Sequence, residues 1–376
     1  MKITTTLSRY LARTYFMNML LLLLALLAVI YLFDTVELIR RAGKRPDVPL
    51  TLVLQMSLLK LPEVGQLLFP FAILFSAMFT FWQLSRRYEL VVVRASGFSV
   101  WQFLAPVVGV AVFIGIFQVT VFNPVGSLLV SKYEQLEQIH LSRQKNQIAV
   151  FKEGLWLRQR ADGGKEGENA KDKDGGYVIL HAAKIKQPHW VLKNVTVLYF
   201  DENDWFESRV DAKQATLEKG RWLFSDVMIY KVQEEVRNEN FYALPTQLTP
   251  EDIEESFASP ETMSFWRLPG YIQTLEETGF DATRLRVYYQ SLLSQPLMFA
   301  AMVLLAATVS MRPPRFRGGM VLFALGVFIG FLVFFMSSFL QALGASGQIP
   351  TILAAWSPAL ICFLSGVGVM MNLEDG

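Results

Sequence analysis

The sequence predicts an α-helical membrane protein with six transmembrane helices and a β-jelly-roll domain inserted between the third and fourth helices. The chain is apolar, with 52% hydrophobic residues and a mean hydropathy of +0.33. Its charge is also segregated, because residues 131–284 hold 20 of the 35 Lys and Arg residues and 26 of the 33 Asp and Glu residues. This acidic stretch lies between two apolar blocks, which indicates a water-exposed domain inserted into a membrane protein.

A helix needs about 20 mainly apolar residues to cross a bilayer, because it rises about 1.5 Å per residue across roughly 30 Å of hydrocarbon. Six segments meet this requirement. They are Tyr15–Phe33, Val64–Leu84, Val100–Phe122, Val287–Met311, Gly319–Ala342 and Thr351–Met371. The predicted domains are therefore 1–122 for the first three helices, 123–284 for the inserted domain and 285–376 for the last three helices.

Basic residues in the short loops predict the orientation, since Lys and Arg prefer the cytoplasmic side of a membrane. With the N-terminus inside, the inner loops hold nine such residues and the outer short loops hold four. Both termini are therefore expected in the cytoplasm, and the inserted domain is expected outside. No small-residue cleavage site follows the first span, so we interpret this span as an uncleaved anchor.

The inserted segment has the pattern of short strands separated by turns. Runs such as QIAVF, YVILHAAKI, VTVLYF and RWLFSDVMIYKV are bounded by Gly, Asn, Asp and Pro, which favours a β-sandwich or jelly roll. The single cysteine, Cys362, lies in the sixth span. We therefore expect no disulfide inside the β-domain.

Catalytic motifs are absent from the sequence. There is no phosphate-binding loop, no HExxH zinc motif and no GxSxG nucleophile motif, and the three histidines show no metal-ligand spacing. The spans carry almost no ionisable groups at mid-depth, which argues against an ion-coupled carrier. We expect no catalytic residue, metal site or cofactor on this chain.

The stretch Ser85–Ser99, SRRYELVVVRASGFS, lies between the second and third spans. It is amphipathic and predicts a short helix along the membrane surface that can transmit motion from a soluble partner. Gly97 is expected to end this helix, because glycine tolerates the left-handed conformation found there. The charged residues of the stretch are Arg86, Arg87, Glu89 and Arg94. In the alternative interpretation, Glu89 only pairs with Arg86 or Arg87 on an exposed helix.

The string LSRRYELVVVRASGFS resembles the cytoplasmic coupling segment of the LptF/LptG family of lipopolysaccharide export permeases, with the LptG branch closer. Further matches are RRAG after the first span, LPEVGQLLFP entering the second and SQPLMFAAMVLLAA in the fourth. The resemblance implies a permease subunit of an ABC transporter in the bacterial inner membrane. Such a transporter extracts lipopolysaccharide and passes it to a periplasmic bridge toward the outer membrane.

The resemblance also implies partners for this chain. One is an LptB-like cytoplasmic ATPase dimer, which holds the ATP and Mg, and another is a second, LptF-like six-span permease. A single-span LptC-like bridge protein and a downstream bridge follow in the periplasm. The resemblance implies no nucleic acid. Glu89 would face a basic residue of the ATPase groove, with valines beside it. The implied coupling residues are Arg86, Arg87, Glu89, Val92, Arg94 and Gly97.

A basic cluster just beyond the first span runs against the preference for inner positive charge. It consists of Arg40, Arg41, Lys44 and Arg45. Arginine offers a planar fork for phosphate oxygens, and the resemblance supports basic residues here as contacts for lipopolysaccharide phosphates. The alternative is an interfacial cluster that binds any anionic lipid.

The acyl chains of such a substrate need an apolar chamber. The fifth span offers six phenylalanines: Phe323, Phe328, Phe331, Phe334, Phe335 and Phe339. Phe328, Phe331 and Phe335 are the chamber candidates, although aromatic residues in a span more often face lipid or neighbouring helices. Gly326 and Gly330 of the same span form a GxxxG step that permits close packing against another chain.

Two other classes remain open from the sequence. An ATPase-linked mechanotransmitting permease resembling FtsX or MacB would have four spans with the outer domain after the first, whereas three spans precede it here. A lipid-modifying membrane enzyme would need a positioned acid, base, nucleophile or metal cluster, and the sequence shows none.

Overall fold

The computed structural model describes residues 5–43, 49–140, 147–151, 154–160, 176–186, 191–201, 204–218, 220–231, 235–246, 259–310 and 319–375. The chain forms two compact units. A helical unit comprises Met1–Ser142, Pro260–Leu268 and Thr283–Gly376, and a sheet unit comprises Arg143–Ser259 and Pro269–Ala282.

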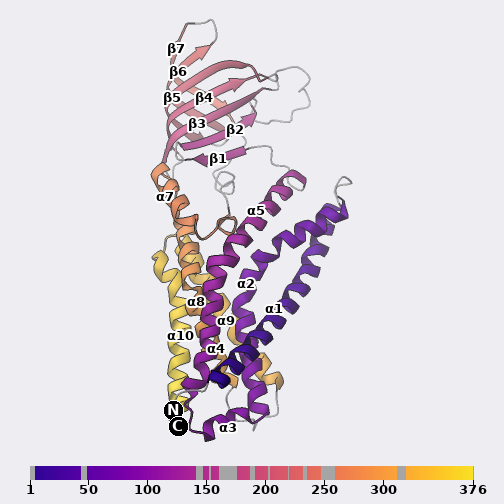
Figure 1. The fold of residues 1–376 in the computed structure, drawn as a ribbon. Coiled ribbons are helices and arrows are strands. Elements are labelled where there is room, and N and C mark those ends of the chain that lie inside the picture. Colours follow the sequence, from indigo (N-terminus) through magenta and orange to yellow (C-terminus); the bar gives the residue numbers. More distant parts are fainter. Residues whose placement is uncertain are drawn as a thin grey trace. The chain divides into compact units, whose positions relative to one another are not determined.

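The helical unit contains the membrane-spanning helices (Figure 1). Its elements are α1 (Thr5–Ala42), α2 (Leu50–Arg86), α3 (Glu89–Ala95), α4 (Val100–Phe117), the π-helix η1 (Gln118–Phe122), α5 (Asn123–His140), the 3-10 helix η2 (Pro260–Thr262), α8 (Thr283–Ser310), α9 (Gly319–Ala345) and α10 (Thr351–Asp375). Among the described residues, 6 helical segments are long and apolar enough to cross a membrane: α1, α2, the continuous α4–η1–α5 run, α8, α9 and α10. The predicted six spans, with a β-region between the third and fourth, are confirmed.

Several helices extend beyond the predicted spans. α1 begins at Thr5, α2 begins at Leu50, and the third helix continues to His140. An apolar window marks only the centre of such a helix, because polar residues on one face of its flanks do not interrupt the backbone hydrogen bonds. The sheet unit consequently begins at Arg143, later than the predicted boundary at residue 123.

Small residues let the helices of this unit approach closely. A Cβ atom on Gly115 of α4 would lie 2.6 Å from the Cα atom of Pro296 in α8, so only glycine fits this crossing. A Cβ atom on Gly330 of α9 would lie 3.1 Å from Cδ1 of Phe71 in α2. The GxxxG step therefore packs within the chain, and not against another chain as the sequence suggested.

Asn123, directly after the π-helix, uses both ends of its fully buried side chain. Its Nδ2 donates to Oε1 of Gln66 at 3.0 Å and to the hydroxyl of Tyr288 at 3.2 Å. Its Oδ1 accepts from the backbone N–H of Phe265 at 2.8 Å. These bonds connect α2, α8 and the segment 260–268 to the third span. They pair polar groups that have no water to bond to in an apolar interior.

The sheet unit contains one seven-stranded antiparallel sheet in the order β1-β2-β3-β4-β5-β6-β7 (Figure 1). The strands are β1 (Gln147–Phe151), β2 (Gly154–Arg160), β3 (Tyr177–Lys186), β4 (Val191–Phe200), β5 (Phe206–Glu218), β6 (Arg221–Lys231) and β7 (Arg237–Pro245), followed by helix α7 (Leu268–Thr278). Their register aligns one row of buried side chains across the sheet: Leu157, Leu180, Val197 and Val210.

The sheet folds onto its own buried face, because non-neighbouring strands bond across the interior. Nε2 of Gln159 in β2 donates to the carbonyl of Pro245 in β7 at 3.0 Å. The hydroxyls of Tyr199 in β4 and Tyr242 in β7 lie 2.7 Å apart, and burial raises the pKa of Tyr199. The two layers of the predicted sandwich thus come from one folded meander, and the described strands do not show the strand order of a jelly roll.

Replacing Asn123 with leucine is expected to destabilise the helical unit by about 2–4 kcal/mol, since three hydrogen bonds of roughly 1 kcal/mol are lost and a buried N–H is left unpaired. Unfolding of the full chain in mixed micelles would measure this. Asn372→Leu, at an exposed position of α10, is the control and should change stability by less than about 0.5 kcal/mol. Equal stability of the two variants would contradict the role given to Asn123.

Trp222 is fully buried inside the folded sheet, whereas Trp205 is 74% exposed. Trp222→Ala is expected to destabilise the sheet unit by about 3–5 kcal/mol, because it removes a large buried side chain and leaves a cavity. Pulse proteolysis of the full chain would follow the loss. Trp205→Ala should have little effect, and a similar loss in both variants would show that Trp222 is not part of the core.

Candidate functional site

A short helix lies where the sequence predicted one between the second and third spans, and its two ends are set by backbone geometry. α2 ends at Arg86, Tyr88 takes a positive φ of 59°, and α3 then runs from Glu89 to Ala95. Gly97 has a φ of 81°, and the N–H of Phe98 donates to the carbonyl of Val93 at 3.4 Å, which is a Schellman ending. The predicted helix and its ending at Gly97 are confirmed.

The next helix starts after only a short turn. Ser99 caps α4, and its side chain accepts from the N–H of Trp101 at 3.2 Å. The side chain of Gln102 accepts from the N–H of Ser99 at 3.4 Å, which completes a capping box. α3 is therefore joined to α4 by defined backbone turns.

Glu89, at the start of α3, is held by two neighbours. Its Oε2 accepts from the hydroxyl of Tyr10 in α1 at 3.1 Å. Its Oε1 lies 4.0 Å from the guanidinium of Arg87, and its side chain keeps 34% exposure. Arg86 instead lies over the ring of Trp82, with 4.9 Å between Cζ and the ring centroid. The alternative pairing of Glu89 is thus seen with Arg87, not Arg86, and leaves the carboxylate accessible.

α3 presents an apolar face to its surroundings. Val91 and Val92 are 59% and 63% exposed, while Leu90 is buried and Val93 packs against the core of the helical unit. Arg94 belongs to α3, but its side chain lies outside the described part of the structure. Exposed valines beside an accessible carboxylate form a surface suited to a protein partner.

The second predicted site lies at the end of α1. Nε and Nη2 of Arg40 donate to the carboxylate of Glu37 at 2.8 and 2.7 Å. Nε of Arg41 donates to the same carboxylate at 3.0 Å, and its Nη1 lies 3.7 Å from Oε1 of Glu137. Both arginines remain more than half exposed, at 71% and 52%. Lys44 and Arg45 lie outside the described residues.

A cluster of polar side chains about one helical turn before Glu37 connects α1 and α2. Nζ of Lys60 donates to Oδ1 of Asp34 at 3.1 Å and lies 5.6 Å from the ring centroid of Tyr133. The hydroxyl of Thr35 donates to that of Ser57 at 2.9 Å. Lys60 is therefore an ion-paired residue between helices.

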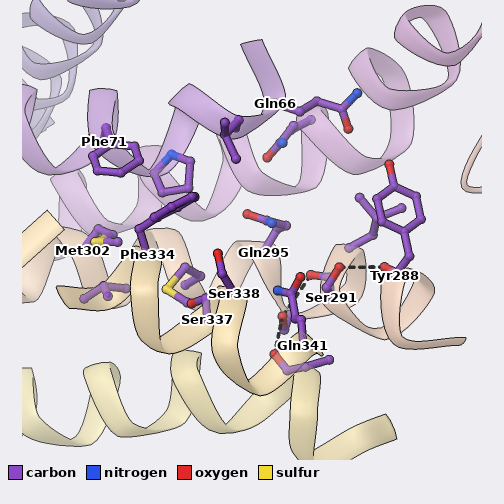
Figure 2. Close-up of a pocket in the computed structure, with 18 of the residues that line it drawn as sticks. Gln66, Phe71, Tyr288, Ser291, Gln295, Met302, Phe334, Ser337, Ser338 and Gln341 are labelled. Carbon is purple, nitrogen blue, oxygen red and sulfur yellow. Dashed lines mark hydrogen bonds between the residues drawn. The ribbon is translucent and has the colours of Figure 1, made fainter. Parts of the chain in front are cut away.

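The helical unit also contains a partly open cavity of ≈ 360 Å³ that the sequence did not predict (Figure 2). Its walls come from α2, the π-helix η1, η2, α8, α9 and α10. Phe71, Met302 and Phe334 lie toward one end, and polar side chains such as Gln66 and Gln341 toward the other (Figure 2).

The three phenylalanines predicted to line an acyl chamber do not line this cavity. Phe328, Phe331 and Phe335 are 62%, 62% and 61% exposed, on a face of α9 where Phe331 and Phe335 stack at 6.3 Å. Phe334, another of the phenylalanines that the fifth span offered, lines the cavity instead. The helical period puts these residues on different faces, and the sequence does not say which face is covered.

Sequence reasoning missed Tyr10, Asn123 and Gln118. Polar residues within an apolar span are a general signal, but their partners lie far away in the chain: Tyr10 and Glu89 are 79 residues apart, and Asn123 and Tyr288 are 165 apart.

In the part of the chain that the structure describes, no group of three or more His, Cys, Asp or Glu residues could hold a metal ion.

Comparison with known proteins agrees with this architecture. The family model "Lipopolysaccharide export system permease LptF/LptG" matches residues 9–372. The permease protein LptG of Escherichia coli is 24% identical over 374 residues, covering 97% of this chain and 98% of its own. LptG of Haemophilus influenzae is 24% identical over 365 residues, covering 95% of each chain. Because the family model spans nearly the whole chain, this protein belongs to the LptF/LptG family of lipopolysaccharide export system permeases.

Proposed function

We propose that this chain is the LptG-type permease subunit of an inner-membrane ABC transporter that extracts lipopolysaccharide and passes it to a periplasmic bridge. The observation that carries the proposal is α3, which offers the accessible carboxylate of Glu89 next to exposed Val91 and Val92. This surface suits docking to a cytoplasmic ATPase dimer, which would hold the ATP and Mg. The chain itself would not be an enzyme.

The contacts of α3 support a coupling role. α3 lies in the chain between α2 and α4, and the Tyr10–Glu89 hydrogen bond connects it to α1. A displacement of α3 by an ATPase would therefore act on three spans. Arg86, Arg87, Arg94 and Gly97 would shape this docking surface. A basic residue of the ATPase groove would compete with Tyr10 and Arg87 for Glu89.

The second permease would contact the apolar faces that this chain leaves open. α1 and α9 are the least buried spans, with 11% and 17% of their most apolar windows inside the chain. A lateral opening between the two permeases would expose Phe328, Phe331 and Phe335 to acyl chains. Lipopolysaccharide phosphates would meet Arg40 and Arg41 at the end of α1, together with Lys44 and Arg45.

The sheet unit would lie in the periplasm and pass lipopolysaccharide toward an LptC-like partner and the downstream bridge. Three spans precede the sheet, which favours this function over the FtsX or MacB type, where one span precedes the outer domain. The match to a permease family favours a transporter subunit over a lipid-modifying enzyme.

The proposal is tested by tagging the chain, purifying it gently from its native membrane and identifying what comes with it. Recovery of an ATPase and a second six-span protein, with hydrolysis that responds to lipopolysaccharide, is the expected result. If the chain purifies alone and nucleotide has no effect, the coupling proposal fails.

Glu89→Lys is expected to reduce ATPase retention or lipopolysaccharide-stimulated hydrolysis at least about tenfold, because it replaces an attraction with like-charge repulsion at the docking surface. Co-purification and ATPase assays of the complex would measure this. Glu207→Lys, the same change at an exposed position of β5, is the control. Normal transport together with normal ATPase retention in Glu89→Lys would remove this residue from the mechanism.

Arg40 and Arg41 already share the carboxylate of Glu37, so a phosphate must compete with it. The double variant Arg40→Ala and Arg41→Ala is expected to weaken lipopolysaccharide binding about tenfold. Glu37→Gln should strengthen it, because the two guanidinium groups are released. Titration of lipopolysaccharide against ATPase stimulation would measure both.

Arg284→Ala, at an exposed position near the start of α8, controls for a general loss of positive charge. If Arg284→Ala weakens binding as much as the double variant, the cluster acts only as an attractor for anionic lipid. If Glu37→Gln weakens binding, Glu37 does not compete with the phosphate.

A further inference from the structure

The outer face of the sheet, opposite its buried face, carries an open groove of ≈ 490 Å³ that crosses strands β4 to β7 (Figure 1). Successive side chains of a strand point to opposite faces of a sheet. The residues that alternate with the buried row therefore form an outer row, and the register pairs its members across six strands: Trp156, His181, Thr196, Asp211, Met228 and Asn238. The last four members of this outer row line the groove.

An interruption of the strand pairing runs along the groove. The register pairs the residues on both sides of four positions and leaves those positions out: Asn194, Lys213, Asp226 and Asn240. These residues follow one another across β4, β5, β6 and β7, and all of them line the groove. Asn194 and Asp226 have positive φ angles of 51° and 53°. Backbone strain of this kind is concentrated at ligand sites and switches, so the groove is part of the backbone design of the sheet.

The charged side chains of the groove largely neutralise one another. Nε of Arg209 donates to Oδ1 of Asp211 at 2.9 Å, and Nζ of Lys213 donates to Oδ2 of Asp226 at 3.3 Å. Glu239 is the remaining charged residue of the described lining. A phosphate would have to take each base away from a carboxylate. The groove therefore disfavours a strongly anionic ligand.

The uncharged polar groups of the groove suit a ligand with hydroxyl groups. Asn194, Asn238 and Asn240 bring three side-chain amides to the lining, and an amide both donates and accepts hydrogen bonds, as a sugar hydroxyl does. The ion pairs also leave room for hydroxyl donors. The hydroxyl of Thr196 already donates to Asp211 at 2.7 Å while Asp211 holds Arg209. A ligand hydroxyl can thus add to an ion pair without separating it.

The outer row supplies aromatic rings next to the groove. His181 is paired in register with Thr196, and Trp156 stacks on His181 with 4.3 Å between the ring centroids. Both side chains are only partly buried. The negative face of an aromatic ring attracts the C–H bonds on the flat side of a pyranose ring. An acyl chain in the groove would instead cover its amides without bonding to them.

We propose that the groove and the Trp156–His181 stack together bind a short stretch of pyranose saccharide. Its hydroxyl groups bond to the asparagine amides and to the carboxylates of Asp211 and Asp226, and one sugar ring packs against the aromatic stack. Two sources carry this chemistry, the saccharide part of lipopolysaccharide and a free glycan. Assignment to lipopolysaccharide rests on the proposed function, whereas the binding of saccharide by the groove does not.

Saturation-transfer NMR of the full chain, in micelles of a detergent that contains no sugar, tests the groove with two soluble probes. One is the oligosaccharide that mild acid releases from lipopolysaccharide, treated to remove its phosphates, and the other is maltoheptaose. The released oligosaccharide is expected to bind with a dissociation constant of about 1 mM or tighter. Binding of this probe alone would identify lipopolysaccharide as the source. Binding of maltoheptaose as well, or of maltoheptaose alone, would identify a site for glycans in general.

Variants place the saccharide in the groove. Asn194→Gly removes an amide and keeps the left-handed backbone available, and Asn238→Ala removes a second amide from an exposed position. Each variant should weaken the binding about three- to tenfold, the effect of one lost hydrogen bond. Gln273→Ala removes an amide at an exposed position of α7, outside the groove, and should keep the full affinity.

Absence of binding by both probes would overturn the proposal. Full affinity in both Asn194→Gly and Asn238→Ala would also overturn it, because the saccharide would then lie elsewhere on the chain. Co-purification of the ATPase is measured separately and does not depend on these variants. A failed saccharide test therefore leaves the export function standing, and a chain that binds saccharide but purifies without an ATPase loses only the export function.

Discussion

The buried carboxamide of Asn123 is the interaction on which the helical unit depends. It follows a π-helical turn and bonds to Gln66 of α2, Tyr288 of α8 and the backbone of Phe265. In an apolar interior each of these groups would otherwise lack a partner. Gln66 and Tyr288 also line the cavity, so the same hydrogen bonds that join the helices fix the polar end of that cavity. Its shape is therefore a consequence of how the spans are connected.

The candidate sites differ in how their polar groups are satisfied. Arg40 and Arg41 are already paired with Glu37, and Glu89 with Tyr10 and Arg87. A ligand at either place exchanges one partner for another, which suits reversible contact during a transport cycle. The cavity differs, because the buried oxygen of Gln118 has no hydrogen-bond partner among the residues that the structure describes.

The features predictable from sequence were those set by local chemistry. Long apolar windows gave the six spans, and the glycine in RASGFS gave the end of α3, since both depend on residues close together in the chain. Features that depend on distant residues were missed: the hydrogen bonds of Asn123, the Tyr10–Glu89 hydrogen bond and the cavity. The helical period placed Phe331 and Phe334 on different faces, but only the packed helices show that Phe334 lines the cavity. The folded meander escaped prediction for the same reason, because strands predict a sheet but not its curvature.

The backbone turns at both ends of α3 have a consequence for how the family diverges. The positive φ at Tyr88, the Schellman ending at Gly97 and the capping box at Ser99 fix the path of the chain without using the exposed side chains. Val91 and Val92 can therefore be exchanged over evolutionary time while the helix keeps its position. At the proposed docking surface, these side chains could change together with those of an ATPase while α3 keeps its place. Low sequence identity is therefore compatible with an unchanged backbone path at α3.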